Sequence, residues 1–179
     1  MATATEYAGK QSGFSIREWI FTTDHKKIGI IYLIGSMAAF LVAGLMAVGI
    51  RLEQMQVGDS GLINYFVGDF THAMTTGDAY NAALYFHGAA MILAFLIPGL
   101  TGFAANYFVP LMIGAPDVAF PRINALSVWL FWGGILLALL SFVIPDKPDI
   151  MWTGYPPYAI TTNSNTALYV FTVHLIGFS

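Results

Sequence analysis

The sequence predicts an all-α fold, a polytopic bundle of transmembrane helices with four spans, the last of them truncated. Two observations support this prediction. Hydrophobic residues make up 57% of the 179 residues and charged residues only 9%, whereas about 25% of the residues of a soluble domain are charged. The charged residues are also gathered in short segments, and the uncharged runs between them reach the roughly 20 residues that cross a bilayer core.

The first two spans are predicted at about 28–50 and 82–109. Residues 28–50 contain no Asp, Glu, Lys, Arg or His. The run is too long for a signal peptide, and no obvious cleavage site accompanies it. The second uncharged stretch contains His87, Pro98 and Asn106 and is longer than one crossing needs, so we place the helix over its central part.

The third and fourth spans are predicted at about 123–144 and 166–179. The third is rich in Trp, Phe, Leu and Gly, and its aromatic residues are expected to face lipid or to pack against other helices. The fourth is about half as long as a crossing requires. A terminus inside the bilayer would leave backbone groups without hydrogen bonds. We therefore expect the helix to continue, either in a longer chain or in a second polypeptide.

The distribution of basic residues predicts the orientation. Those on the N-terminal side of the membrane are Lys10, Arg17, Lys26, Lys27 and Arg122. The opposite side holds only Arg51 and Lys147. Because cytoplasmic loops are enriched in Lys and Arg, the N-terminus is expected on the cytoplasmic side.

Composition also excludes several kinds of function. A net charge of −3 with scattered basic residues gives no nucleic-acid footprint. The absence of cysteine excludes thiolate chemistry, so a metal would need His, Met, carboxylate or a bound cofactor. Of the histidines, His25 flanks the first span and is read only as part of its cytoplasmic flank, and His72 is expected in a solvated outer loop.

His87 and His174 lie inside predicted spans, where an ionisable side chain is costly and suggests function. His87 could ligate a haem iron, ligate another metal, or bond to a neighbouring helix, and Gly88 beside it leaves room for a flat macrocycle. His174 is expected at a similar depth on a parallel helix. Together the two would suit a four-helix b-type cytochrome, although we favour the interpretation of His174 as a buried structural histidine bonded to a backbone or hydroxyl partner.

The connection GAPDVAFPR between the second and third spans holds Asp117 and Arg122. It is bracketed by prolines and cannot be regular helix throughout. Asp117 is either a solvated residue paired with Arg122 or a carboxylate at a water-accessible mouth, followed inward by Asn106, Asn124 and Ser127. Arg51, followed by Glu53, ends the first span and reads as a snorkelling anchor.

Four runs together resemble a known family. TTDHKKIGIIYL, YFHGAAMI, NYFVPLMIGAPDVAFPRINALSVW and YPPY are similar to subunit I of the cytochrome c oxidases of the haem-copper superfamily, nearly colinearly from residue 22 to 179. The resemblance implies a subunit of about twelve transmembrane helices. Residues 1–179 would form the N-terminal part of that one domain, helices one to four.

The resemblance implies a terminal respiratory oxidase that transfers electrons from cytochrome c to oxygen and pumps protons. It implies that His87 is an axial ligand of the low-spin haem, expected to be haem a, and that Arg51 lies near its formyl group. Asp117 matches the entrance of a proton pathway, and Glu53 matches a residue near an outer cation site in some members. The polar residues that match the pathway are Asn106, Asn124, Ser127 and Tyr32.

Two departures accompany the resemblance. Tyr85 stands where the family usually has a hydroxyl residue two positions before the haem-ligating histidine, and Asn124 with Ala125 stands where paired asparagines are usual. These changes would alter the water path. His174 matches a family histidine that does not bind haem.

The resemblance places the second low-spin haem ligand, the high-spin haem and the copper ligands in the helices that follow, so the chain alone should not reduce oxygen. The implied partners are those remaining helices in the same or a separate chain, subunits II and III, cytochrome c or a fused cytochrome domain, and the lipid bilayer. The implied location is a bacterial plasma membrane or the mitochondrial inner membrane. A quinol-oxidising or nitric-oxide-reducing relative and a non-catalytic membrane assembly subunit remain alternatives.

Overall fold

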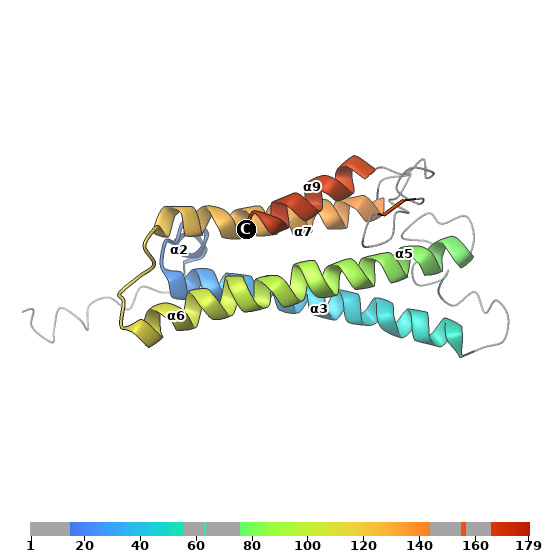
Figure 1. Cartoon of the computed structure of the whole chain (residues 1–179), viewed down its shortest axis with the longest axis horizontal. Helices are drawn as coiled ribbons and strands as arrows, with labels where there is room; N and C mark the ends of the chain where they lie inside the picture. Colours follow the sequence, from blue (N-terminus) through green and yellow to red (C-terminus); the bar gives the residue numbers. More distant parts are fainter. Residues whose placement is uncertain (1–14, 56–62, 64–75, 144–154, 157–165) are drawn as a thin grey trace, which may run out of the picture.

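Residues 15–55, 63, 76–143, 155–156 and 166–179 are described by the computed structural model, and every regular element in these ranges is a helix. This confirms the all-α fold class. The helices form an elongated bundle whose neighbours alternate in direction (Figure 1). Lys10, His72 and Lys147, which the sequence analysis assigned to the ends of spans or to loops, lie outside the described residues.

Helix α3 (His25–Gln54) contains the first predicted span and extends it at both ends. Its start is fixed by Asp24, whose side chain accepts a hydrogen bond of 2.8 Å from the backbone N–H of Lys26. Such a cap satisfies one of the N–H groups that a helix start leaves without an intrahelical partner. With 30 residues, α3 is about 45 Å long, which is more than the hydrocarbon core requires.

The second helical column consists of four consecutive elements, namely α5 (Thr76–Ala89), η2 (Ala90–Leu96), η3 (Pro98–Ala105) and α6 (Asn106–Ile113). Its middle, η2 and η3, is π-helical. Pro98 supplies no N–H to the helix, and it opens η3. The column ends at Gly114, whose φ of 71° is a left-handed conformation that glycine adopts without steric penalty.

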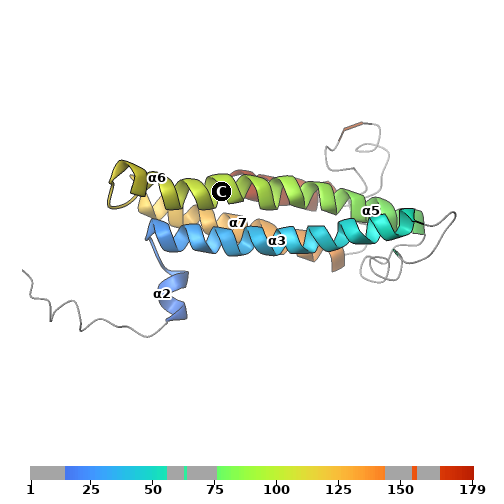
Figure 2. The same ribbon diagram turned by 90° about the horizontal axis from the view of Figure 1, so that it is seen from below.

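Helices α7 (Pro121–Val143) and α9 (Thr166–Gly177) form the other side of the bundle. Pro121 is the first residue of α7, a position where the missing N–H of proline costs nothing. Helix α9 packs along α7 and reaches η2. The short helix α2 (Ile16–Ile20) lies beside the bundle at the end where α3 begins (Figure 2).

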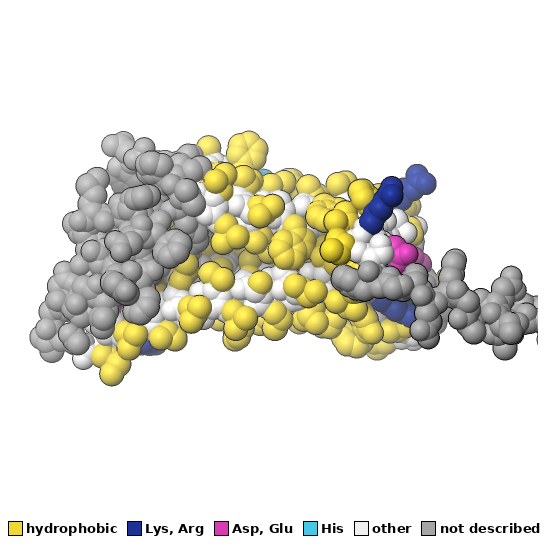
Figure 3. Space-filling model, turned by 180° about the vertical axis from the view of Figure 1, so that it is seen from behind, with side chains coloured by type: hydrophobic (Ala, Val, Ile, Leu, Met, Phe, Trp, Pro, Cys, Tyr) yellow, Lys and Arg dark blue, Asp and Glu magenta, His cyan; other side chains and the backbone are white. Residues whose placement is uncertain are grey.

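The main core lies between α3, η2, α7 and α9, and its buried members are Ile28, Tyr32, Ala94, Val128, Phe131 and Ile176. Large hydrophobic side chains also cover the outside of the bundle, and Figure 3 shows them as a broad belt with charged side chains only near its ends. Three helices, His25–Gln54, Tyr80–Ile113 and Pro121–Ser141, are long and apolar enough to cross a membrane. An apolar outer belt of this length is what lipid contact requires.

Candidate functional site

His87 lies near the end of α5 and faces the second half of α3. Its Nδ1 atom lies 2.9 Å from the main-chain carbonyl oxygen of Ala43. A carbonyl oxygen only accepts hydrogen bonds, so the proton of the neutral imidazole must be on Nδ1. The lone pair of Nε2 is then available, and histidines that bind a metal through Nε2 have this tautomer and this kind of support.

Arg51 lies in the last turn of α3, about 12 Å along the helix axis from Ala43 at 1.5 Å per residue. Its Nη1 donates to Gln54 Oε1 at 3.1 Å, and Gln54 Nε2 donates to the Tyr80 hydroxyl at 2.7 Å. These bonds tie the end of α3 to α5. Within the described ranges, the exposed Arg51 therefore contacts Gln54 and not His87.

Glu53 lies next to this network and binds the backbone of Ile63. Its Oε2 accepts a hydrogen bond of 3.1 Å from the backbone N–H of Ile63. Across the part of the chain that the structure describes, no group of three or more His, Asp or Glu could hold a metal ion. Glu53 therefore belongs to no such group among these residues, and the outer cation site at Glu53 stays a prediction.

His174 does not share a site with His87. Its Nδ1 donates to the Val170 carbonyl one turn earlier at 2.7 Å, and its side chain is exposed. Helix α9 turns a different face toward α5 and η2, the face of Tyr169, Val173 and Ile176. The paired arrangement of a four-helix b-type cytochrome is not formed by these two histidines.

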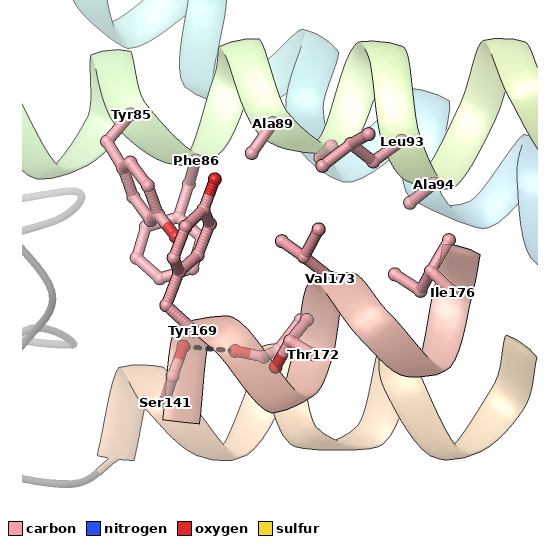
Figure 4. A pocket seen from close by; sticks show the side chains of 12 residues that line it. Tyr85, Phe86, Ala89, Leu93, Ala94, Ser141, Tyr169, Thr172, Val173 and Ile176 are labelled. Carbon is pink, nitrogen blue, oxygen red and sulfur yellow. Dashed lines mark hydrogen bonds between the residues drawn. The ribbon is translucent and has the colours of Figure 1, made fainter. Parts of the chain in front are cut away.

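A small cavity lies between α5, η2, α7 and α9, and Figure 4 shows its lining. Its volume is about 60 Å³ and its walls are almost entirely apolar. At one end, Tyr85 and Tyr169 pack edge to face with ring centroids 5.4 Å apart. Tyr85 is thus buried against an aromatic partner on α9.

A hydrogen-bonded row of side chains lies at the other end of the bundle. The Tyr32 hydroxyl donates to Ser127 Oγ at 2.8 Å, and Ser127 Oγ donates to the Asn124 carbonyl at 2.8 Å. The Tyr32 hydroxyl also lies 3.4 Å from the carbonyl oxygen of Ser179. The structure therefore brings Tyr32, Ser127 and Asn124, predicted from three separate positions, into one row between α3 and α7.

The Asn124 side chain has an unsatisfied donor. Its Nδ2 atom is buried and has no hydrogen-bond partner among the described residues. Buried polar groups are nearly always hydrogen-bonded to protein or to ordered water, and an orphan amide is a typical anchor for a buried water. The interior near Asn124 is therefore suited to holding water.

Asn106 lies at the start of α6 and is held by two bonds. Its side-chain Nδ2 donates to the Gly102 main-chain carbonyl at 2.7 Å, and the main-chain carbonyl of Asn106 accepts from His25 Nδ1 at 2.8 Å. His25 is 1% exposed, and its hydrogen bond joins the start of α3 to the start of α6. Sequence reasoning assigned His25 only to the flank of a span, because nothing in its neighbourhood along the chain indicates a contact with residue 106.

Asp117 lies in the connection between α6 and α7, seven residues before Asn124. It is half-buried, and its Oδ1 accepts a hydrogen bond of 2.7 Å from the backbone N–H of Val118. Among the residues that the structure describes, the ion pair is Lys27 with Glu18, and none joins Asp117 to Arg122. The predicted ordinary ion pair in this loop is therefore not formed.

Comparison with known proteins gives consistent matches. The family described as Cytochrome C and Quinol oxidase polypeptide I matches residues 27–179. The heme-copper oxidase subunit I+III of Aeropyrum pernix is 43% identical over 143 residues, 79% of this chain and 16% of that protein. The cytochrome c oxidase subunit 1 of Thermostichus vulcanus is 39% identical over 160 residues, 89% of this chain and 26% of that protein. The chain thus spans about a quarter or less of the length of these curated relatives.

Proposed function

Because the chain belongs to the family of cytochrome c and quinol oxidase polypeptide I, we propose that it works within a terminal respiratory oxidase that transfers electrons from cytochrome c to oxygen and pumps protons. The chain corresponds to the N-terminal region of subunit I. Its own contribution in this proposal is one axial ligand of the low-spin haem, His87, and a proton entrance at Asp117. The cofactor is haem a, and the high-spin haem and copper belong to the rest of the subunit.

The observation that supports this proposal best is the fixed imidazole of His87. The bond to the Ala43 carbonyl leaves Nε2 as a ligand atom, and an imidazole is a common axial ligand of haem iron. Gly88 adds no side chain beside it. The residues present therefore fit one side of a haem, which when bound supplies one-electron transfer. In the proposal Arg51 lies toward the edge of this haem, and Glu53 belongs to an outer cation site.

The residues at the other end would move protons. Asp117 would collect protons at the cytoplasmic mouth, because its half-buried carboxylate lies in the connection before α7 and, among the described residues, forms no ion pair with Arg122. Water bound at the unsatisfied Asn124 Nδ2 would continue the path toward Ser127 and Tyr32, which already share a hydrogen bond. Asn106 would line the same path. None of these residues needs to touch a metal.

The partners in this proposal are the remaining helices of subunit I, subunits II and III, and cytochrome c or a fused cytochrome domain. The Aeropyrum relative is named as a fusion of subunits I and III, which supports subunit III as a partner. The family description names quinol beside cytochrome c. Steady-state assays with reduced cytochrome c and with a quinol would identify the electron donor.

The ligand assignment is tested by replacing His87 with Ala in the assembled oxidase. The reduced-minus-oxidised spectrum should lose its low-spin a-type haem signal, because no other side chain on α5 can supply the imidazole. His174→Ala is the matched control, since His174 also bonds through Nδ1 to a main-chain carbonyl but faces outward. The control should keep the full signal. An assembled His87→Ala complex with an intact low-spin signal would show that the ligand assignment is wrong.

A further inference from the structure

Ser36 is a buried hydroxyl in the membrane-spanning part of α3. Its side chain is 0% exposed, and its Oγ has no hydrogen-bond partner among the described residues. Buried polar groups are nearly always hydrogen-bonded to protein or to ordered water, because a buried hydroxyl without a bond has lost its hydration and gained nothing in return. The surroundings of Ser36 therefore indicate what completes its hydrogen bonding.

The other serine and threonine side chains described in the interior of helices bond to their own helix. Each donates to a main-chain carbonyl three or four residues earlier at 2.6 to 2.9 Å, namely Thr101, Ser127, Ser141 and Thr172. Such back-bonding is a common arrangement for hydroxyls inside helices. Ser36 forms no bond of this kind to the carbonyls of Tyr32 or Leu33. Its hydroxyl is therefore available to a group outside α3.

Ser36 faces η3 at Gly99, a position without a side chain. A Cβ placed on Gly99 would lie 4.0 Å from both the Cβ and the Oγ of Ser36 and, apart from its own stretch of helix, would meet no other atom within 4 Å. One turn away the same two helices are in closer contact, because a Cβ at Gly102 would collide with the ring of Tyr32. Gly99 therefore leaves a gap beside the Ser36 hydroxyl, whereas Gly102 leaves none.

The winding of the second column next to this gap supplies a hydrogen-bond acceptor. The N–H of Ile97 bonds to the main-chain carbonyl five residues earlier, which is the π-helical register. In this register the next N–H would reach the carbonyl of Leu93, but residue 98 is a proline and has no N–H. The Leu93 carbonyl points along the column toward Pro98, the neighbour of Gly99. A buried water commonly bonds to two to four polar groups, and this carbonyl and the Ser36 hydroxyl are two.

From these observations we propose that one ordered water molecule is bound beside Gly99, between α3 and the π-helical part of the second column. The Ser36 hydroxyl donates to the water oxygen, and the water donates to the carbonyl of Leu93. Both buried groups are then satisfied by one molecule. The site consists of α3 and this column alone, so it does not depend on the roles proposed for His87 and Asp117.

The direct test is a map of the complete oxidase that contains this chain, obtained by electron cryo-microscopy at a resolution that shows ordered water. A peak should lie within hydrogen-bonding distance of Ser36 Oγ and of the Leu93 carbonyl oxygen, and it should be missing from the map of Ser36→Ala. A wild-type map without this peak would overturn the proposal, and so would a peak that persists in Ser36→Ala.

A second test uses the gap at Gly99 and measures the half-life of the haem absorbance at a fixed high temperature, because large complexes unfold irreversibly. Gly99→Ala places a methyl group in the gap without a clash and should displace the water. The half-life should then fall by about fivefold or more, the factor expected when a buried hydrogen bond is lost. In the Ser36→Ala background, where the water is already absent, Gly99→Ala should leave the half-life unchanged.

Gly44→Ala is the matched control in both backgrounds, because a Cβ at Gly44 also meets nothing within 4 Å and lies away from Ser36. Its effect on the half-life should be the same with and without Ser36→Ala. Equal effects of Gly99→Ala in the two backgrounds would mean that the gap holds no water bound to Ser36, and the proposal would fail.

Discussion

At the scale of single residues, two carboxylates just outside the helices, Asp24 before α3 and Asp117 between α6 and α7, differ in their surroundings. Asp24 is exposed and caps α3 through the backbone of Lys26. Asp117 is half-buried, accepts a hydrogen bond from the backbone N–H of Val118, and lies seven residues before Asn124. In the proposed proton path, water bound at the unsatisfied Nδ2 of Asn124 would lead from Asp117 toward Ser127.

Replacement of Asp117 by Asn should reduce turnover and proton pumping together while the haem spectra stay unchanged. Asparagine keeps the size and hydrogen-bonding capacity but cannot ionise, so proton relay is lost. The spectra are unaffected because His87 lies in α5, far along the bundle from this loop. Stopped-flow proton uptake and steady-state oxygen consumption measure the effect.

Asp24→Asn provides the comparison for this experiment. Asn and Asp cap helices about equally well, so this variant removes an ionisable group from the same end of the bundle without disturbing α3. It should keep full turnover and pumping. Full activity of Asp117→Asn as well would mean that Asp117 is an ordinary solvated loop residue.

At the scale of helices, the contact between η3 and α3 depends on the absence of a side chain at Gly102. A Cβ placed there would collide with the ring of Tyr32. Tyr32 is 1% exposed and also stacks on Phe131 with centroids 5.1 Å apart, so the ring has no free space to move into. The position of the Tyr32 hydroxyl beside Ser127 is therefore set by how closely η3 approaches α3.

Gly102→Ala should therefore destabilise the helix pair by about 1–3 kcal/mol, the usual range for overpacking, and should slow turnover by displacing the Tyr32 hydroxyl. Thermal denaturation of the assembled oxidase, followed by loss of the haem absorbance, measures the first effect. Gly44→Ala is the matched control, because a Cβ at Gly44 meets nothing within 4 Å and Ala is the better helix former. Equal denaturation midpoints for both variants would contradict the close-packing argument.

The helices also show which features could be predicted from sequence. Long uncharged runs indicated α3, the α5 to α6 column and α7, because lipid excludes charge from such segments. The π-helical winding of η2 and η3 was not predicted, since no apolar periodicity distinguishes it from an α-helix. The row of Tyr32, Ser127 and Asn124 was expected from a family resemblance, but the bond between His25 and Asn106 joins residues 81 positions apart and leaves no local signal.

At the scale of the whole molecule, the chain offers His87 as a haem ligand from one side only. His174 faces away from it, and His25 lies at the other end of α3, bonded to Asn106. The chain corresponds to a quarter or less of the length of its curated relatives. A haem bound to His87 would therefore need its second axial ligand and much of its protein environment from other helices.

The chain expressed alone should accordingly fail to retain stoichiometric low-spin haem. A single imidazole with one face of a binding site gives the haem no second axial ligand and leaves its other face without a protein wall. The haem-to-protein ratio of the purified chain, from its pyridine haemochrome spectrum, gives the measurement. Co-expression with a polypeptide that carries the remaining helices should restore the haem. Stoichiometric haem a on the chain alone would refute the prediction.

The hydrogen bond of His87 to the carbonyl of Ala43 has a consequence for how such a site can change over generations of mutation. The acceptor belongs to the main chain, so every amino acid at position 43 provides it. Ala43 is 0% exposed, so a replacement there is limited by the volume and polarity of its side chain. The orientation of the imidazole thus depends on the backbone of α3 and not on the side chain at position 43. Of this pair of residues, only His87 must keep its identity for the haem ligand to be retained.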